Sequence, residues 1–422
     1  MKLTIEDIKK AFTPKREIKD PKQFIGRFKE IKKSVNFLNT DGSFLMVYGL
    51  RGLGKSSLAN QIKLIAEGND TLLKLCKLDK FIPKKGFNYL VHLVKCDNSI
   101  IDIATLIHRI ILGDEKNPSL YNYVKNTDKK VDKALKLFAD KMDLVKKNEK
   151  NSDFTSPELS HDIIQIFRQA LSVIRKDNQE KSGIIILVDE FDIIANKNNF
   201  ASLVKSLSDD EFIKFGIVGI ADDLSDLLQE HASIARQIEP VEVGLMNDFE
   251  LEQIINVAET TINKEITFNS DAKTKMIIAA KGLPYHIHLI GKEALEYALE
   301  HDLTEIKEEI ITECEESIIS GNSNSIYRES YNLICNTAAR ELMLRFIAKE
   351  QDNYVRIEDL YSKLKTIGVE KPSNYLEELT SSVDKAPTIK IVRDNMCRFI
   401  DPLFRLYVNL RTPIFEDNKK YL

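Results

Sequence analysis

The sequence predicts an α/β fold built on a parallel sheet, followed by helices and a C-terminal winged-helix domain. Residues 43–57 read as an apolar strand, a glycine loop and a helix with apolar residues at helical spacing. Residues 183–188 form a continuous apolar run without alternation, which is typical of a central strand buried on both faces of a parallel sheet. After residue 325, helical stretches precede two short strands and a final helix. That order is typical of a winged helix.

Glycines and a lysine follow the first strand at a specific spacing. Residues 49–56 fit the pattern G-x-x-x-x-G-K-[ST]. In this pattern backbone N–H groups surround the α- and β-phosphates, the lysine reaches the β- and γ-phosphate oxygens, and the hydroxyl binds Mg²⁺. The following helix directs its positive end at the anion. We therefore expect a nucleotide to contact Gly49, Arg51, Gly52, Leu53, Gly54, Lys55, Ser56 and Ser57, with Ser56 also a Mg²⁺ ligand and Lys55 also catalytic.

Two carboxylates follow the second apolar run. Asp189 and Glu190 stand at the carboxyl end of the predicted strand, which is where open α/β sheets bind ligands. We expect Asp189 to hold Mg²⁺, directly or through water, and Glu190 to orient and deprotonate the attacking water. The alternative is a strand that ends in surface acids. The glycine loop about 135 residues earlier favours the catalytic interpretation.

Composition and charge narrow the class of protein. The chain has 422 residues, enough for two or three domains, and its net charge of −4 gives no overall attraction to nucleic acid. No apolar run approaches the roughly 20 residues that a membrane helix needs, and the N-terminus lacks a signal-peptide core. The five cysteines are scattered and form no C-x-x-C pair. We therefore expect a cytoplasmic protein with reduced cysteines and no membrane contact.

Other stretches complete the predicted order of elements. Apolar spacing predicts a helix that ends near residue 38, a strand over 87–95, helices over 100–112 and 157–175, and a strand that starts at 215. The lysine-rich residues 125–151 are expected to form a solvated helical hairpin inserted in the fold. A nucleic-acid-binding patch is the alternative for this insertion, although its acids dilute the charge.

Residues 24–30, with the sequence F-I-G-R-F-K-E, precede the glycine loop by about 20 residues. This stretch resembles the G-R-x-x-E box of AAA+ and STAND ATPases. The resemblance implies that Ile25 and Arg27 pack beside adenine, whereas a solvated turn before an amphipathic helix is the alternative. It also implies a P-loop NTPase core with a five-stranded parallel sheet, a helical lid, and ATP with Mg²⁺ as cofactors. No N-K-x-D guanine motif accompanies the loop.

Two further residues are assigned through this resemblance. Residues 215–224 resemble the G-I-S-N-D-L segment of origin-recognition AAA+ ATPases, and Asp222 holds the position of the asparagine that senses the γ-phosphate. A carboxylate there repels phosphate unless Mg²⁺, a proton or water intervenes. Residues 231–243 resemble the stretch that carries an arginine finger, which implies that Arg236 completes the site of a neighbouring copy in a homo-oligomer. A surface ion pair is the alternative for Arg236.

Residues 282–288, with the sequence G-L-P-Y-H-I-H, match the G-x-P signature of STAND ATPases. The resemblance implies that Pro284 packs near the base of the nucleotide. No arginine lies between Arg236 and Arg328, so the second sensor arginine of AAA+ proteins is missing. His286 and His288 diverge by about 200° on a helix and are not expected to bind a metal.

The predicted winged helix carries little basic charge where it would meet DNA. The helix expected over 373–382 contains Glu377 and Glu378 and no lysine or arginine, and residues 354–411 hold ten basic and eight acidic residues. The predicted wing is richer in positive charge, with Lys385, Lys390, Arg393 and Arg398. The ending D-P-L-F-R-x-Y, from residue 401, resembles the tail of STAND-like ATPases. We favour contact with a protein partner or autoinhibition over DNA binding.

Together these observations predict an ATPase core over residues 1–245 with an insertion at about 114–150, a helical lid over 246–322 and a winged-helix domain over 323–422. The predicted function is a slowly hydrolysing, ATP-binding molecular switch whose nucleotide state controls the winged-helix domain and its assembly with partners or with itself. Two alternatives stay open. One is an ATP-dependent DNA-binding initiator, loader or transposition-type regulator, and the other is a nucleotide-stabilised scaffold with little turnover.

Overall fold

The computed structural model describes residues 3–124, 157–223, 227, 234–320, 325–381, 388–392 and 395–421. The predicted insertion at 125–151 lies outside these residues, as do Lys385 and Arg393 of the predicted wing. The chain forms two compact units. The core unit comprises residues 17–50 and 54–244, and the C-terminal unit comprises residues 1–16, 51–53 and 245–422. The predicted division into three domains stays a prediction.

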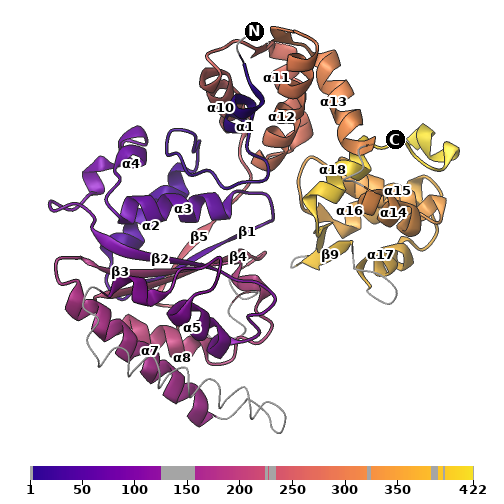
Figure 1. Cartoon of the computed structure of the whole chain (residues 1–422). Coiled ribbons are helices and arrows are strands. Elements are labelled where there is room, and N and C mark those ends of the chain that lie inside the picture. Colours follow the sequence, from indigo (N-terminus) through magenta and orange to yellow (C-terminus); the bar gives the residue numbers. More distant parts are fainter. Residues whose placement is uncertain are drawn as a thin grey trace. The chain divides into compact units, whose positions relative to one another are not determined.

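A five-stranded parallel sheet forms the centre of the core unit (Figure 1). The order of its strands is β2-β3-β4-β1-β5, and every pairing is parallel. The predicted α/β class with a five-stranded parallel core is therefore confirmed. The strands are β1 (Phe44–Gly49), β2 (Tyr89–Lys95), β3 (Gly183–Asp189), β4 (Ile213–Ile220) and β5 (Ile238–Glu242).

Helices cover both faces of this sheet. Figure 1 shows α2 (Phe28–Asn39) and α3 (Lys55–Ala66) on one face, and α5 (Ile103–Leu112), α7 (Pro157–Asp177) and α8 (Phe200–Ser208) on the other. This double cover explains the unbroken apolar run, because every residue of β3 is buried. Short helical pieces connect the larger elements: α4 (Thr71–Leu75), η1 (Asp79–Phe81), η2 (Leu120–Tyr123) and η3 (Phe191–Ile193).

The register of the strands brings functional candidates to one edge of the sheet. Lys95 at the end of β2 lies opposite Asp189 at the end of β3, and Gly49 at the end of β1 lies opposite Ile220 at the end of β4. All the strands point the same way, so the glycine loop and the acids after β3 leave the sheet at a common edge. In open α/β folds this edge is where ligands bind.

Helices of the predicted lid open the C-terminal unit. They are α10 (Asp248–Thr261), α11 (Ser270–Ala280), α12 (Pro284–Glu300) and α13 (Glu308–Ser320), with a parallel pair of two-residue strands, β6 (Thr267–Phe268) and β7 (Glu305–Ile306). An additional helix, α1 (Ile5–Ala11), packs against α10 and α12. The buried Ile8, Ala11 and Phe12 belong to this unit, whereas the predicted division, which stays a prediction, counts residues 1–16 with the core. A capping box between Thr4 and Asp7 begins α1.

The last hundred residues follow the predicted order of elements, and the winged-helix assignment stays a prediction. The stretch expected to be helical over 325–349 is divided into two helices, because the Thr337 hydroxyl caps the second by accepting the N–H of Arg340. Strands β8, β10 and β9 form an antiparallel sheet. The elements are α14 (Ser325–Ile334), α15 (Ala338–Lys349), β8 (Val355–Arg356), α16 (Ile357–Thr366), α17 (Pro372–Thr380), β9 (Ile389–Val392), β10 (Met396–Phe399), α18 (Pro402–Leu410) and η6 (Glu416–Tyr421).

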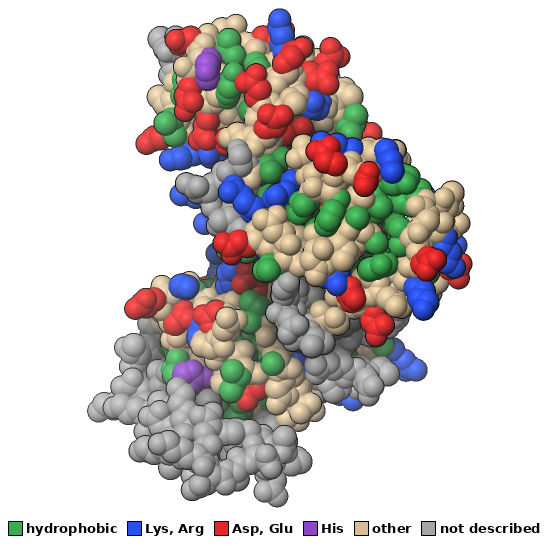
Figure 2. Space-filling view, turned by 90° about the vertical axis from the view of Figure 1, so that its right-hand side faces the viewer, with side chains coloured by type: hydrophobic (Ala, Val, Ile, Leu, Met, Phe, Trp, Pro, Cys, Tyr) green, Lys and Arg blue, Asp and Glu red, His purple; other side chains and the backbone are tan. Residues whose placement is uncertain are grey.

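Charge on the face drawn in Figure 2 is mixed in sign. Figure 2 shows Asp and Glu side chains beside Lys and Arg on the face that it draws. This mixture agrees with the small net charge of −4 and does not favour nucleic acid over protein as a partner. In the described part of the chain, none of the helices combines the length and apolar character needed to span a bilayer.

We predict that the protein loses stability as the pH falls from about 7 to 5. Burial lowers the pKa of His92, His286 and His288 from 6.5 to about 4, so these side chains stay neutral in the folded protein and take up protons on unfolding. Each should remove about 2 kcal/mol of unfolding free energy between pH 7 and pH 5. Denaturant titrations of His92→Phe should show a pH dependence smaller by that amount. An unchanged dependence would contradict this, and His301→Gln, at an exposed position, is the control.

Candidate active site

The glycine loop connects β1 to α3. Gly52 and Gly54 adopt φ angles of +82° and +86°, a region that glycine enters without strain. Gly54 is the N-cap of α3 and offers no side chain to cap it. The first N–H groups of the helix therefore face the loop, as an anion-binding helix terminus requires.

Lys55 is the first residue of α3, and its side chain folds back into the loop. The side chain is 8% exposed, and Nζ donates a hydrogen bond to the carbonyl oxygen of Leu50 at 2.7 Å. The ammonium group is thus held among the backbone groups of the loop itself. A phosphate oxygen at this place would accept a charge-assisted hydrogen bond, which is stronger than the one to a neutral carbonyl.

Ser56 and Asp189 lie close together, although 133 residues separate them in the chain. The Ser56 hydroxyl lies close enough to the Asp189 carboxylate, which is 5% exposed, to lower the pKa of that carboxyl. Burial raises the pKa of Asp189, against the opposing effects of Ser56, the Glu190 N–H and the charge of Lys95. A hydroxyl and a carboxylate at one point are the hard oxygen ligands that Mg²⁺ prefers, so the donor set fits this ion.

Glu190 turns away from the strand in a left-handed conformation, with φ at +58°. Its N–H donates to Asp189 Oδ1 at 2.9 Å, and its Oε1 lies 3.1 Å from Lys95 Nζ. The same ammonium lies 3.5 Å from Glu17 Oε1. Partial burial lowers the pKa of Lys95, but these carboxylates outweigh that effect and raise it, so Lys95 stays charged.

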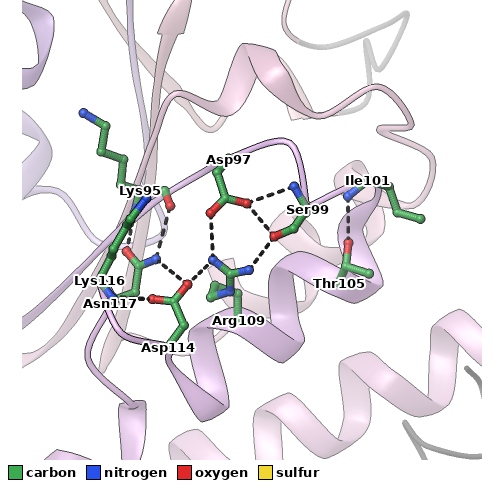
Figure 3. A network of polar contacts seen from close by, with 9 residues as sticks. All are labelled: Lys95, Asp97, Ser99, Ile101, Thr105, Arg109, Asp114, Lys116 and Asn117. Atoms are coloured by element: carbon green, nitrogen blue, oxygen red, sulfur yellow. Dashed lines mark hydrogen bonds and ion pairs between the residues drawn. The ribbon is translucent and has the colours of Figure 1, made fainter.

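The backbone of Lys95 is held by a polar network on the free edge of β2 (Figure 3). The Asn117 side chain accepts the Lys95 N–H at 2.8 Å and donates to the Lys95 carbonyl at 3.3 Å. Asp114 accepts the N–H of Asn117 at 2.6 Å and also pairs with Arg109. The amide of Asn117 therefore replaces a neighbouring strand at the residue whose side chain meets Glu190.

Asp192 is a third acid at this edge, and sequence analysis missed it. Its Oδ1 accepts the N–H of Ile220 at 2.8 Å, which ties the end of β4 to the turn after β3. Asp222, the predicted sensor, follows two residues later and is partly exposed. Its place after β4 agrees with the sequence, and its role stays a prediction. The signal for Asp192 was its position two residues after Glu190.

Arg27 and Ile25 lie in the turn before α2, where the structure suggests a different role for Arg27. The Arg27 guanidinium is 4% exposed, donates to the carbonyl of Gly244 at 2.6 Å and pairs with Glu30 at 3.2 Å. The G-R-x-x-E residues therefore bind each other and the last residue of the core unit. The half-exposed Ile25 is the better candidate for contact with adenine.

The remaining predicted residues lie apart from this cluster. Arg236 is exposed in the turn before β5. Pro284 is buried at the first position of α12 in the C-terminal unit, to which loop residues 51–53 also belong. Ser57 accepts the N–H of Ile18 at 3.0 Å, so its hydroxyl is engaged by the N-terminal segment.

Comparison with known proteins supports the fold. No protein-family model matches the chain, and no curated protein matches its sequence. The Walker-type ATPase PABY2304 of Pyrococcus abyssi is 14% identical, with a TM-score of 0.50 and 93% of this chain and 98% of that chain covered. The Aeropyrum pernix ORC2 protein, solved as ADPNP–ADP complexes, is 13% identical, with a TM-score of 0.47 and 90% and 92% covered. The first similarity confirms a P-loop ATPase fold, and the fold alone.

We predict that Arg27→Met destabilises the protein by about 2–3 kcal/mol, because it leaves the Gly244 carbonyl and the Glu30 carboxylate without their buried partner. Denaturant unfolding without nucleotide measures this loss. Lys29→Met, at an exposed position of the same helix, is the matched control. Equal stability of the two variants would show that Arg27 has no structural role.

Proposed function

We propose that this protein is a Mg²⁺-dependent ATPase that acts as a molecular switch. The observation that carries the proposal is the meeting of Ser56 and Asp189, with Lys55 folded into the adjacent glycine loop. A triphosphate needs these three functions together: backbone donors, a lysine, and oxygen ligands for its metal ion. The choice of ATP over GTP rests on the resemblance of residues 24–30 to the adenine box.

Each residue has a distinct task in the proposed reaction. Backbone N–H groups of residues 52–56 bind the phosphates, and Lys55 moves from the Leu50 carbonyl to the β- and γ-phosphate oxygens. Ser56 and Asp189 would hold Mg²⁺, which neutralises charge that develops on the phosphates. Glu190 orients the attacking water and accepts its proton. Lys95 fixes the Glu190 carboxylate at this edge of the sheet.

The observations weaken the DNA-binding alternative. Arg398 of the predicted wing is 5% exposed and donates to the carbonyl of Phe399, so it is not a surface cation. The sequence of α17 contains no basic residue, and its exposed Glu378 pairs with Arg340 of α15. We therefore propose a protein or a second copy of this chain as the partner whose binding depends on the nucleotide. Arg236, exposed before β5, would complete the neighbouring site in the second case.

We predict that Lys55→Ala weakens ATP binding about 100-fold, because a charge-assisted contact with the phosphates is lost. Glu190→Gln should bind ATP normally and lower kcat about 100-fold or more, since the glutamine cannot accept a proton. Calorimetry and phosphate release measure the two effects. Glu211→Gln, at an exposed position of the core unit, is the control. Equal turnover by wild type and Glu190→Gln would refute the proposed mechanism.

We also predict that Asp189→Asn stabilises the nucleotide-free protein at pH 7. Burial raises the pKa of this carboxyl, so its ionised form costs stability above the folded pKa, and the neutral amide relieves that cost. The variant should also lose the stabilisation that Mg²⁺ with ATP confers on the wild type. Denaturant unfolding with and without Mg²⁺–ATP tests both effects. Asp209→Asn, at an exposed position, is the control, and a destabilised Asp189→Asn variant would contradict the prediction.

A further inference from the structure

The N-terminal segment is anchored at two places, one in each unit. In the C-terminal unit, the Phe12 ring is fully buried and lies edge-on to Phe268 and His288. It packs so closely on Gly291 that a Cβ there would lie 2.4 Å from the ring. The N–H of Thr13 donates to His288 Nδ1 at 3.3 Å. This end of the segment is therefore fixed to α12.

In the core unit, the segment is fixed to α3, the helix that begins at the glycine loop. The N–H of Ile18 donates to Ser57 Oγ at 3.0 Å, and Gln61 donates to the Ile18 carbonyl at 3.0 Å. Asn60 donates to Glu17 Oε2 at 2.8 Å. Ser57, Asn60 and Gln61 stand at i, i+3 and i+4, so they share one face of the helix.

From this second anchor the segment reaches the site. Glu17 presents Oε1 to Lys95 Nζ at 3.5 Å, and the same ammonium pairs with Glu190 Oε1 at 3.1 Å. One cation is thus shared by two carboxylates. The backbone of Lys95 is fixed on both sides by Asn117, so its ammonium can respond to a change at Glu17 mainly by rotation of its side chain.

We propose that residues 12–18, here called the N-terminal tether, couple movement of the lid helices to Glu190 through Lys95. Between Thr13 and Glu17 the chain can extend by at most about 14 Å. A turn at residues 13–16 keeps this stretch shorter than that limit. If α12 moves farther than this stretch can extend, Glu17 is pulled away from Lys95. The Lys95 ammonium then pairs with Glu190 only. Glu17 and Lys95 are positioning residues in this scheme, which rests on the proposed role of Glu190.

Hydrogen exchange tests the tether without nucleotide. Phe12→Ala removes the lid anchor and should speed exchange at residues 17–19, in the other unit, about fivefold or more. Ile5→Ala, at a 53% exposed position of α1, is the matched control. If Phe12→Ala unfolds the lid, as circular dichroism would reveal, Phe12→Leu takes its place. Faster exchange at residues 5–13 with unchanged exchange at 17–19 would overturn the tether.

Kinetics test the link to Glu190. Glu17→Gln keeps an acceptor for Asn60 but removes the negative charge that Glu17 presents to Lys95, so that Lys95 pairs with Glu190 only. This substitution should lower kcat about threefold or more with an unchanged KM for ATP. In a Lys95→Met background the same substitution should have no effect, whereas Lys95→Arg should preserve it. Glu6→Gln, at an exposed position, is the control.

The coupling would be refuted if Glu17→Gln lowered kcat equally in the wild-type and Lys95→Met backgrounds, or if it changed only KM. Absence of ATP hydrolysis by the wild type would instead refute the proposed function, and the exchange experiment would still decide whether the tether transmits movement.

Discussion

The closeness of the Ser56 hydroxyl to the Asp189 carboxylate is the constraint on which the rest of the site depends. Ser56 follows β1 and Asp189 ends β3, yet β4 lies between these strands. Neighbouring strands are about 4.8 Å apart, so the two segments must meet across about 10 Å of sheet. Gly52 and Gly54 make this possible, because their positive φ angles turn the chain so that α3 starts over the edge of the sheet. The parallel register then places Lys95 and Glu190 beside the pair.

The charged groups at this edge have partners within the folded chain. Lys55 donates to the Leu50 carbonyl, Asp189 accepts the N–H of Glu190 and lies beside the Ser56 hydroxyl, and Glu190 pairs with Lys95. A buried charge without a partner would cost several kcal/mol. The folded chain avoids that cost through these internal contacts. They are weaker than the contacts that a metal-bound phosphate would make, so a bound phosphate could replace them.

Side chains outside the recognised motifs hold the motifs in place. Asn117 takes the position of a missing strand beside Lys95, and Asp192 ties β4 to the turn after β3. Arg27 joins the start of α2 to Gly244 at the end of the core unit. The N-terminal segment adds Glu17 to the same charge system. These contacts connect the site to parts of the chain that lie far away in sequence.

Local pattern predicted β1 to β4 and most helices of the core, although not α8, and it placed the glycine loop and the pair Asp189–Glu190 at the ends of their strands. These features depend on spacing, apolar runs and glycine conformation within a few residues. Local pattern missed α1, because the apolar face of this short helix is explained only by its packing against α10 and α12. It did not reveal that Arg27, whose contact with adenine stays a prediction, donates to the carbonyl of Gly244 or that Arg398, in the predicted wing, donates to that of Phe399. It also overlooked Lys95, Asn117 and Glu17. A long polar side chain can form a hydrogen bond or an ion pair with any suitable group within its reach. Which group lies within reach depends on how distant segments of the chain pack together.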